Sequence, residues 1–354
     1  MRKSITVAAL LGALAFSAPA MATSDPAAAI NELKALNVIT FRDLNVASQH
    51  IEGKAWVGGN QTGNITVTQK SGPYTSSTYN SLTVGGNAAT WTAEGGAGGN
   101  IKVQIGGNST GQATINGNGS VETGGTFNSQ AFNANSSKTA TSGVSGLQSS
   151  INAQTASMVS DLKSLSTYLG GLSGTAITSL SKALTYSSGA QYAVFTMSES
   201  VFETSNANFN ALFANMPSDV ITVINVSGLD LDVGGGSNFN SFTGYQNVIW
   251  NFTQATTLDV GNWYGTILSP YATLTQSSGG NITGTVVADT FNMNGEVHVS
   301  TFQGSAANTQ ALLASSVPAA VPEAETWVMM VLGFGFVGAA LRSVRRRGSM
   351  SLVR

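Results

Sequence analysis

Apolar and polar side chains alternate in short runs along most of the chain, and a glycine or an asparagine follows many of these runs. Alternation with a period of two residues, rich in Val, Ile, Thr and aromatic side chains, predicts strands separated by tight turns. The clearest runs are residues 55–57, 65–68, 82–84, 101–105, 192–195, 220–226, 248–252, 266–268, 273–275 and 285–288. Residues 38–133 and 190–303 are therefore expected to be mainly β.

Two segments follow a helical period instead. Residues 24–38 open with the capping candidates Ser24 and Asp25 and predict a short helix. A longer stripe is made of Leu147, Ile151, Met158, Leu162, Leu165 and Leu169. We expect one long amphipathic helix over about residues 146–170, packed along the strands so that it covers an apolar flank.

A Gly-Gly-Asn triplet recurs at the predicted turns. Triplets start at Gly58, Gly85, Gly98 and Gly106, with looser forms at Gly117 and Gly124. Glycine and asparagine tolerate positive φ, so each triplet is expected to turn a corner. Short strands joined by recurring corners indicate a β-solenoid, in which each coil buries its face on the next. Because the spacing of the triplets is irregular, we predict an interrupted solenoid.

Composition favours an exported protein. Only 9% of the residues are charged, and there is no cysteine, which excludes disulfides and Cys-based metal sites. The basic residues gather at the two ends and leave an acidic body, which argues against nucleic acid as a partner. An exterior rich in hydroxyl and amide groups suits an extracellular scaffold.

The first 22 residues have the three parts of a secretory signal peptide. Arg2 and Lys3 are followed by an apolar run over residues 5–16 and by the small residues Ala20 and Ala22. This pattern predicts cleavage by signal peptidase after Ala22. The alternative is an N-terminal membrane anchor, for which the apolar run is short.

The C-terminal segment is organised as a second targeting signal. Pro322, Glu323 and Ala324 precede Trp327, an apolar helix is predicted over residues 327–341, and a basic cluster follows at Arg342, Arg345, Arg346 and Arg347. The apolar residues span roughly 21 Å as a helix, less than the ~30 Å hydrocarbon core, so they form a marginal anchor. The arginines are expected to stop transfer and to leave residues 348–354 as a short cytoplasmic end. Residues 304–321, rich in Ala, Ser and Pro, are expected to form an extended linker.

This order of parts resembles the PEP-CTERM sorting signal of Gram-negative bacteria, with Ala324 where that motif has a second proline. The resemblance covers residues 322–347. It implies transient anchoring in the inner membrane, processing by an exosortase-type protease, and delivery to the cell surface or extracellular matrix. An ordinary tail anchor is the alternative.

Ordered blocks in the body, residues 41–45, 51–60, 263–270, 281–288 and 295–298, resemble the choice-of-anchor A domain of bacterial surface proteins. The resemblance frames most of the domain at residues 23–303. It implies a mainly β fold, namely a discontinuous parallel β-solenoid of the ice-binding and adhesin type with one long helix along it. It also implies adhesion, with a surface polysaccharide or a matrix component as the ligand.

Few residues suggest chemistry. His50 lies near Glu52, and His298 near Glu296, and the two pairs could meet if the coils stack; a metal or an acid–base pair would need a third group. Asp230 and Asp232, followed by glycines, faintly resemble a calcium-binding repeat, but one copy is explained by turn chemistry. No catalytic residue, cofactor or metal is therefore expected.

Threonine pairs with one residue between them occur at Thr66/Thr68, Thr273/Thr275 and Thr283/Thr285. Alternate strand residues share a face, so a flat ladder of such pairs could order water and bind ice. The sequence thus predicts an adhesin-like structural protein that is not an enzyme. The alternatives are an ice-binding protein of similar fold and a secreted carbohydrate-active enzyme, which would need carboxylates that converge in a groove.

Overall fold

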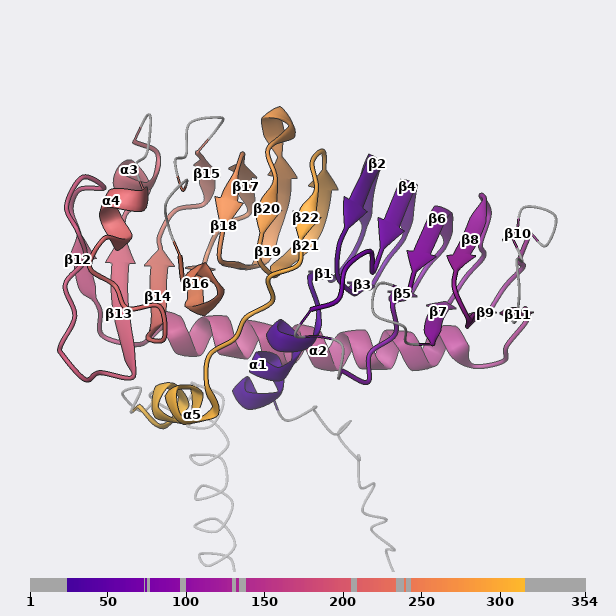
Figure 1. Cartoon of the computed structure of the whole chain (residues 1–354), viewed down its shortest axis with the longest axis horizontal. Coiled ribbons are helices and arrows are strands. Elements are labelled where there is room, and N and C mark those ends of the chain that lie inside the picture. The colour runs from indigo at the N-terminus through magenta and orange to yellow at the C-terminus, as the bar shows by residue number, and fades with distance from the viewer. Residues whose placement is uncertain are drawn as a thin grey trace, which may run out of the picture.

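A computed structural model describes residues 24–72, 74, 77–95, 100–128, 132–133, 138–204, 209–233, 239 and 243–315. The chain is mainly β. Parallel strands stack into a solenoid, and one long helix runs along its flank, as predicted (Figure 1).

The N-terminal half of the solenoid is built of two stacks of parallel strands. The first stack contains β1 (Val38–Thr40), β3 (Ala55–Val57), β5 (Leu82–Val84), β7 (Ile101–Ile105), β9 (Gly119–Thr123) and β11 (Lys138–Thr141). The second contains β2 (Leu44–Ile51), β4 (Gln61–Val67), β6 (Ala88–Glu94), β8 (Ala113–Asn116) and β10 (Phe132–Asn133). Each coil therefore contributes one strand to the first stack and one to the second.

The C-terminal half has three stacks, and two of its long strands, β19 and β21, run through both the first and the second. One stack contains β12 (Thr175–Ile177), β13 (Tyr192–Met197), β14 (Ile221–Val226), β16 (Val248–Phe252) and the first parts of β19 (Thr266–Gln276) and β21 (Val286–Met293). The second contains β15 (Asp230–Asp232), β17 (Thr257–Val260) and the later parts of β19 and β21. The third contains β18 (Trp263–Tyr264), β20 (Ile282–Thr283) and β22 (Val297–His298).

The two halves meet in the middle of the solenoid, where the last coil of the chain lies on the first. Strand β21 pairs with β1 through Val38 and Val286, and with β2 through Leu44 and Phe291. Strand β22 pairs with β2 at Ile51 and Val297. We call this contact the junction. The chain starts at the junction, coils outward to β10 and β11, returns along the long helix and coils back from β12 (Figure 1). The solenoid is thus discontinuous in sequence.

The long helix is α2 (Leu147–Gly170), which lies along both halves (Figure 1). All six residues of the predicted apolar stripe are buried. In one half Trp56 Nε1 donates to Thr155 Oγ1 at 3.0 Å, and in the other Ser166 Oγ donates to Asn251 Oδ1 at 2.6 Å. The helix therefore ties the two halves together on their apolar flank.

The other helices are short. Helix α1 (Pro26–Ala35) is capped by Asp25, whose carboxylate accepts from Ala27 N at 2.8 Å. The remaining ones are α3 (Glu199–Phe202), α4 (Phe209–Phe213), α5 (Ala306–Ala314) and the 3-10 turns η4 (Tyr245–Asn247) and η5 (Ser277–Gly279). The described part of the linker expected at residues 304–321 forms helix α5 and is not extended: Leu312 is buried, and Tyr168 OH donates to its carbonyl oxygen at 2.8 Å.

The Gly-Gly-Asn corners form a ladder through the N-terminal half. The backbone N–H of Asn87 donates to Asn60 Oδ1 at 2.9 Å, and that of Asn108 donates to Asn87 Oδ1 at 2.8 Å. The stacked positions are 27 and 21 residues apart, so coils of unequal length hide the repeat.

The reason for the corner glycines differs from the predicted one. Positive φ is not what these corners require, since no φ in the left-handed region occurs at the described Gly-Gly-Asn glycines. Instead there is no room for a side chain: a Cβ on Gly85 would overlap the carbonyl oxygen of Gly58 in the coil beneath, and one on Gly86 would overlap Asn60 Oδ1.

Two hydrophobic cores result. One fills the solenoid from Ile115 at one end, through Trp91 and Val286, to an aromatic cluster around Trp250 and Trp263 in the C-terminal half. The other lies between the flank of the solenoid and helices α1, α2 and α5. The helices thereby cover one face and leave the faces formed by the second and third stacks open to solvent (Figure 1).

Candidate functional site

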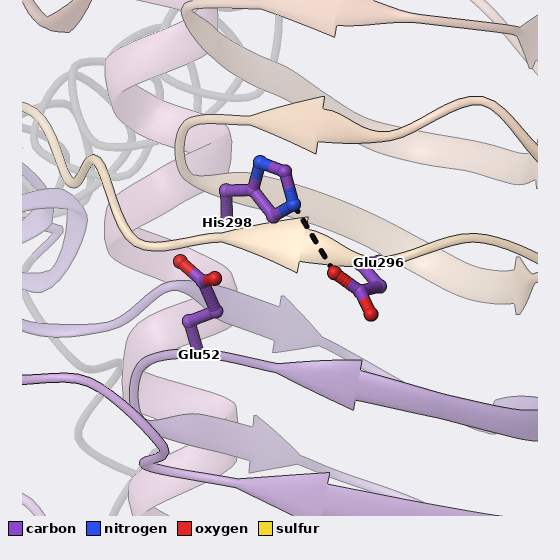
Figure 2. A group of neighbouring side chains, drawn as sticks. All are labelled: Glu52, Glu296 and His298. Carbon is purple, nitrogen blue, oxygen red and sulfur yellow. Dashed lines mark hydrogen bonds and ion pairs between the residues drawn. The ribbon is translucent and has the colours of Figure 1, made fainter. Parts of the chain in front are cut away.

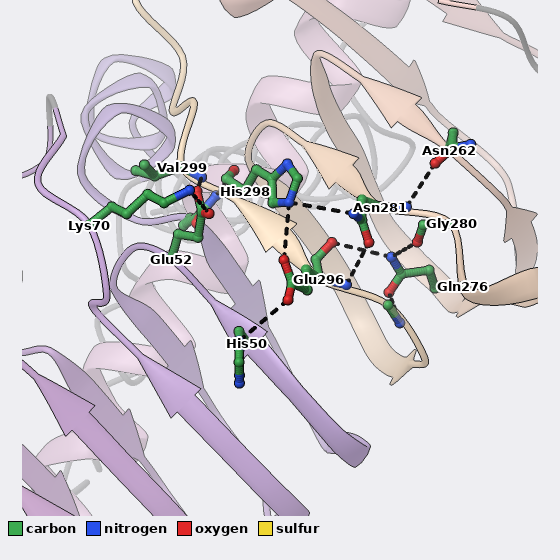
Figure 3. Close-up of polar contacts among 12 residues, drawn as sticks. His50, Glu52, Lys70, Asn262, Gln276, Gly280, Asn281, Glu296, His298 and Val299 are labelled. Atoms are coloured by element: carbon green, nitrogen blue, oxygen red, sulfur yellow. Dashed lines mark hydrogen bonds and ion pairs between the residues drawn. The ribbon is translucent and has the colours of Figure 1, made fainter.

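The only two histidines of the chain meet at the junction. His50 lies in β2 and His298 in β22, and the carboxylate of Glu296 stands between them (Figure 3). His50 Nδ1 is 3.4 Å from Glu296 Oε1, and His298 Nε2 is 3.2 Å from Glu296 Oε2. These two His–Glu pairs were expected to meet if the coils stack, and the parallel pairing of Ile51 with Val297 brings them together.

Glu52 belongs to the same group and is the most buried of its charged members, since its side chain is 6% exposed. Its carboxylate accepts from the backbone N–H of Val299 at 2.9 Å and from the ammonium group of Lys70. Burial opposes ionisation of Glu52, but these two hydrogen bonds, together with the charge interactions with His298 and Lys70, outweigh it and hold the pKa of the carboxyl below its usual range. Glu52 is therefore a fixed negative charge at the junction.

Amide side chains around the charged group hold the loop that carries Glu296 (Figure 3). The backbone N–H of Glu296 donates to Asn281 Oδ1 at 3.1 Å, and that of Gly295 donates to Gln276 Oε1 at 3.1 Å. Asn281 is itself held, because its backbone N–H donates to Asn262 Oδ1 at 2.9 Å. As at the N-terminal corners, each asparagine side chain accepts from a backbone N–H of the next coil, and this ladder positions the carboxylate of Glu296.

Three side chains of the kinds that commonly bind metal ions lie close together at the junction. One ligand atom each of Glu52, Glu296 and His298 lies within 4.8 Å of the other two (Figure 2). The expectation of no metal rested on the lack of a third group beside each His–Glu pair, and the junction supplies that group from the other half of the chain. We call His50, Glu52, Lys70, Glu296 and His298 the junction cluster.

The threonine pairs singled out in the sequence do not form one ladder. Thr68 follows the end of β4, where φ is +56°, and its buried hydroxyl donates to the carbonyl oxygen of Glu94 at 2.5 Å. Thr285 follows Gly284 and is also buried, with its hydroxyl donating to Leu33 O at 2.9 Å. Thr273 lies on β19 in a different stack from Thr66. The three pairs do not stack into one face, because Thr68 and Thr285 lie outside the strands and alternation of faces holds only within a strand.

A different set of threonines does stack. Thr66 of β4 pairs with Thr92 of β6, which pairs with Thr114 of β8. All three are half-buried on an outer face, and within the described residues none of the three hydroxyls has a hydrogen-bond partner. We call them the threonine column. Each of these threonines directly precedes a buried residue of its strand. This shared position is visible in the sequence and could have predicted the threonine column.

The neighbouring polar column is satisfied internally. Thr62 Oγ1 donates to Asn45 Oδ1 at 3.0 Å, and Asn45 Nδ2 donates to Asn292 Oδ1 at 2.9 Å across the junction. Its side chains bond one another, whereas those of the threonine column are left to solvent or to a ligand.

Asp230 and Asp232 are exposed on β15, beside a surface hollow that Glu203 and Asp259 also line. Glu203 Oε1 accepts from the backbone N–H of Asp232 at 3.1 Å, and Thr257 donates to Asp230. The glycines at 234–236 lie outside the described residues. Within those residues, the four carboxylates do not gather into a group close enough to share one metal ion.

The targeting residues also lie outside the described residues and stay predictions. They are Ala20 and Ala22 at the signal-peptide cleavage site, Pro322, Glu323, Ala324 and Trp327 of the sorting motif, and the basic cluster Arg342, Arg345, Arg346 and Arg347. Within the described part of the chain, no helix is long and apolar enough to cross a membrane.

The architecture defines a class: a discontinuous parallel β-solenoid that is covered by helices on one side and presents stacked polar side chains on the other. Residues 30–299 match the model of the family described as the putative ice-binding-like adhesive domain, and the chain belongs to this family. Comparison with curated proteins and with solved structures gave no match.

Proposed function

We propose that this chain is an exported, adhesin-like surface protein whose solenoid binds a polysaccharide or another extracellular-matrix component and does not act on it chemically. The single observation that carries this proposal is the threonine column, three stacked hydroxyls without partners within the described part of the chain. Parallel strands place such groups about 4.8 Å apart. A regular row of free hydroxyls suits a repetitive, hydroxyl-rich ligand, and the adhesive family supports the same use.

A binding screen on glycans and matrix components tests the proposal. Thr92→Lys places a long charged side chain in the middle of the column and is expected to weaken binding at least about tenfold, a loss of about 1.4 kcal/mol. The matched control is Thr273→Lys, which changes another half-buried strand threonine outside the column. Equal binding by the chain and Thr92→Lys would contradict the proposal. Release of reducing sugars from a bound glycan would assign an enzyme instead.

Ice binding is the second candidate, since the same free hydroxyls can order water on a flat face and the family is described as ice-binding-like. The discriminating assay is inhibition of ice recrystallisation by the chain and by the same two variants. Inhibition that Thr92→Lys abolishes, without glycan binding, would assign ice as the ligand.

We further propose that the tail delays release at the inner membrane until an exosortase-type protease cuts near Pro322, Glu323 and Ala324. The motif, the short apolar segment and the arginines that resist crossing support this. Replacement of Arg342, Arg345, Arg346 and Arg347 by neutral residues should let the tail pass through uncut, whereas deletion of residues 322–324 should trap the full-length chain. A fractionation blot measures both. Retention of residues 325–354 on the protein at the cell surface would identify a plain anchor.

A further inference from the structure

We propose that the junction cluster is a binding site for one divalent transition-metal cation, held by Glu52, Glu296 and His298, which clamps the two halves of the solenoid together. The ligand atoms of these three side chains lie within 4.8 Å of one another (Figure 2). Glu52 belongs to the N-terminal half, and Glu296 and His298 belong to the C-terminal half. A cation there would bond two segments that are far apart in sequence.

The separation of Glu296 and His298 already fits a metal of the size of Zn²⁺. In a tetrahedral site with bonds of about 2.1 Å, neighbouring ligand atoms are about 3.4 Å apart. Glu296 Oε2 and His298 Nε2 are already 3.2 Å apart, whereas His50 Nδ1 stands 3.4 Å from the other oxygen of Glu296 and lies outside the group of three. Glu296 and His298 are half-buried, so their side chains can rotate toward the buried Glu52 to close the site around an ion.

Lys70 shows that the site attracts positive charge. Its ammonium group bonds the buried carboxylate of Glu52, yet its side chain is 63% exposed. A flexible, solvated ammonium can leave a carboxylate that a divalent cation binds more strongly, so Lys70 acts as a monovalent competitor for the same oxygen. The backbone N–H of Val299 continues to hold the other oxygen of Glu52.

The donor set selects the class of ion. Imidazole nitrogen with carboxylate oxygen suits Zn²⁺, Ni²⁺ or Cu²⁺, whereas Ca²⁺ and Mg²⁺ take oxygen ligands alone. The ring of Asn281 and Gln276 around the Glu296 loop provides the outer support that metal ligands commonly have. The proposal is therefore specific for a transition metal.

The test uses the full chain after treatment with a chelator and removal of that chelator. A calorimetric titration with ZnCl₂ is expected to show one ion bound per chain. The melting temperature, measured by circular dichroism, should rise by several degrees with excess Zn²⁺. His298→Ala and Glu296→Gln should each weaken binding at least about 100-fold and abolish the rise. Glu122→Gln, which changes a strand carboxylate paired with Lys102, is the matched control and should behave like the parent chain.

A gain-of-affinity variant separates a ligand site from a merely structural cluster. Lys70→Met keeps an unbranched side chain that is one atom shorter and removes the competing charge, so Zn²⁺ should bind several-fold more tightly to this variant. Absence of Zn²⁺ binding, unchanged binding by His298→Ala, or weaker binding by Lys70→Met would overturn the proposal. Binding of Ca²⁺ in preference to Zn²⁺ would overturn the assignment of the ion.

Discussion

The side chain of Asn37 donates a hydrogen bond to the carbonyl oxygen of Gly284 at 2.6 Å, across 247 positions of sequence. The same amide group reaches His298 O at 3.2 Å, and its oxygen accepts from the backbone N–H of Gly53 at 3.0 Å. Asn37 is fully buried, so one side chain satisfies backbone groups of three segments at the junction.

Asn37→Ala is expected to destabilise the fold by about 3 kcal/mol, because it leaves buried backbone groups without partners. Chemical denaturation followed by circular dichroism measures the change. Asn45→Ala is the control: it removes a junction hydrogen bond to Asn292 in a half-buried position and should cost less than about 1 kcal/mol. Equal losses of stability in the two variants would show that the burial of the Asn37 hydrogen bonds does not add to the free energy of unfolding.

The corner glycines yield a second prediction. Gly85→Ala is expected to destabilise the fold by about 3 kcal/mol, since its Cβ would overlap the carbonyl oxygen of Gly58 and approach Asn152 Oδ1 of α2 to 3.3 Å. Gly95→Ala makes the same exchange where the nearest atom, Asn116 O, is 3.5 Å away, and should change stability by less than about 1 kcal/mol. The midpoint of urea unfolding compares the two, and a Gly85→Ala variant as stable as Gly95→Ala would refute the steric account.

Local patterns in the sequence predicted the elements, and the features that they missed depend on contacts between distant segments. The stripe from Leu147 to Leu169 placed α2 within a residue of its observed bounds, because helical period is a local property. The irregular triplets indicated an interruption and the resemblance to a family implied a discontinuous solenoid, but the pairing of Val38 with Val286 leaves no trace in periodicity. Likewise, the sequence pointed to a His–Glu pair near each end of the body that could meet if the coils stack, while the register that brings Glu296 and His298 beside Glu52 is a property of the whole solenoid.

Helix α2 supplies a third prediction. Leu162 is fully buried between α2 and the solenoid, and Leu162→Asp would place an unpaired charge in that core. We expect a loss of about 4 kcal/mol in the free energy of unfolding, or failure to fold. Ala153→Asp introduces the same residue on the exposed side of the helix and should cost less than about 1 kcal/mol. A melting temperature unchanged by Leu162→Asp would mean that the helix does not support the fold.

The carboxyl group of Glu32 makes stability depend on pH. Glu32 of α1 is buried, and burial, with a smaller contribution from the Asp161 carboxylate of α2, raises the pKa of Glu32 to about 8 from its ordinary value of 4.5. Its Oε2 atom has no hydrogen-bond partner within the described part of the chain. Because the folded chain binds this proton more tightly than the unfolded chain, the contribution of Glu32 is fully present below pH 4.5 and is lost as the pH rises to about 8.

Glu32→Gln keeps the shape of the side chain and cannot ionise, so it isolates this contribution. The difference in the free energy of unfolding between the variant and the parent chain should grow in favour of the variant between pH 5 and 8, by on the order of 3 kcal/mol, and level off above that. Urea titrations at a series of pH values measure the difference. Glu122→Gln, which changes a half-buried ion-paired carboxylate, is the control and should show less than about 1 kcal/mol of change. A pH-independent difference for Glu32→Gln would mean that Glu32 is ionised in the folded chain throughout this range.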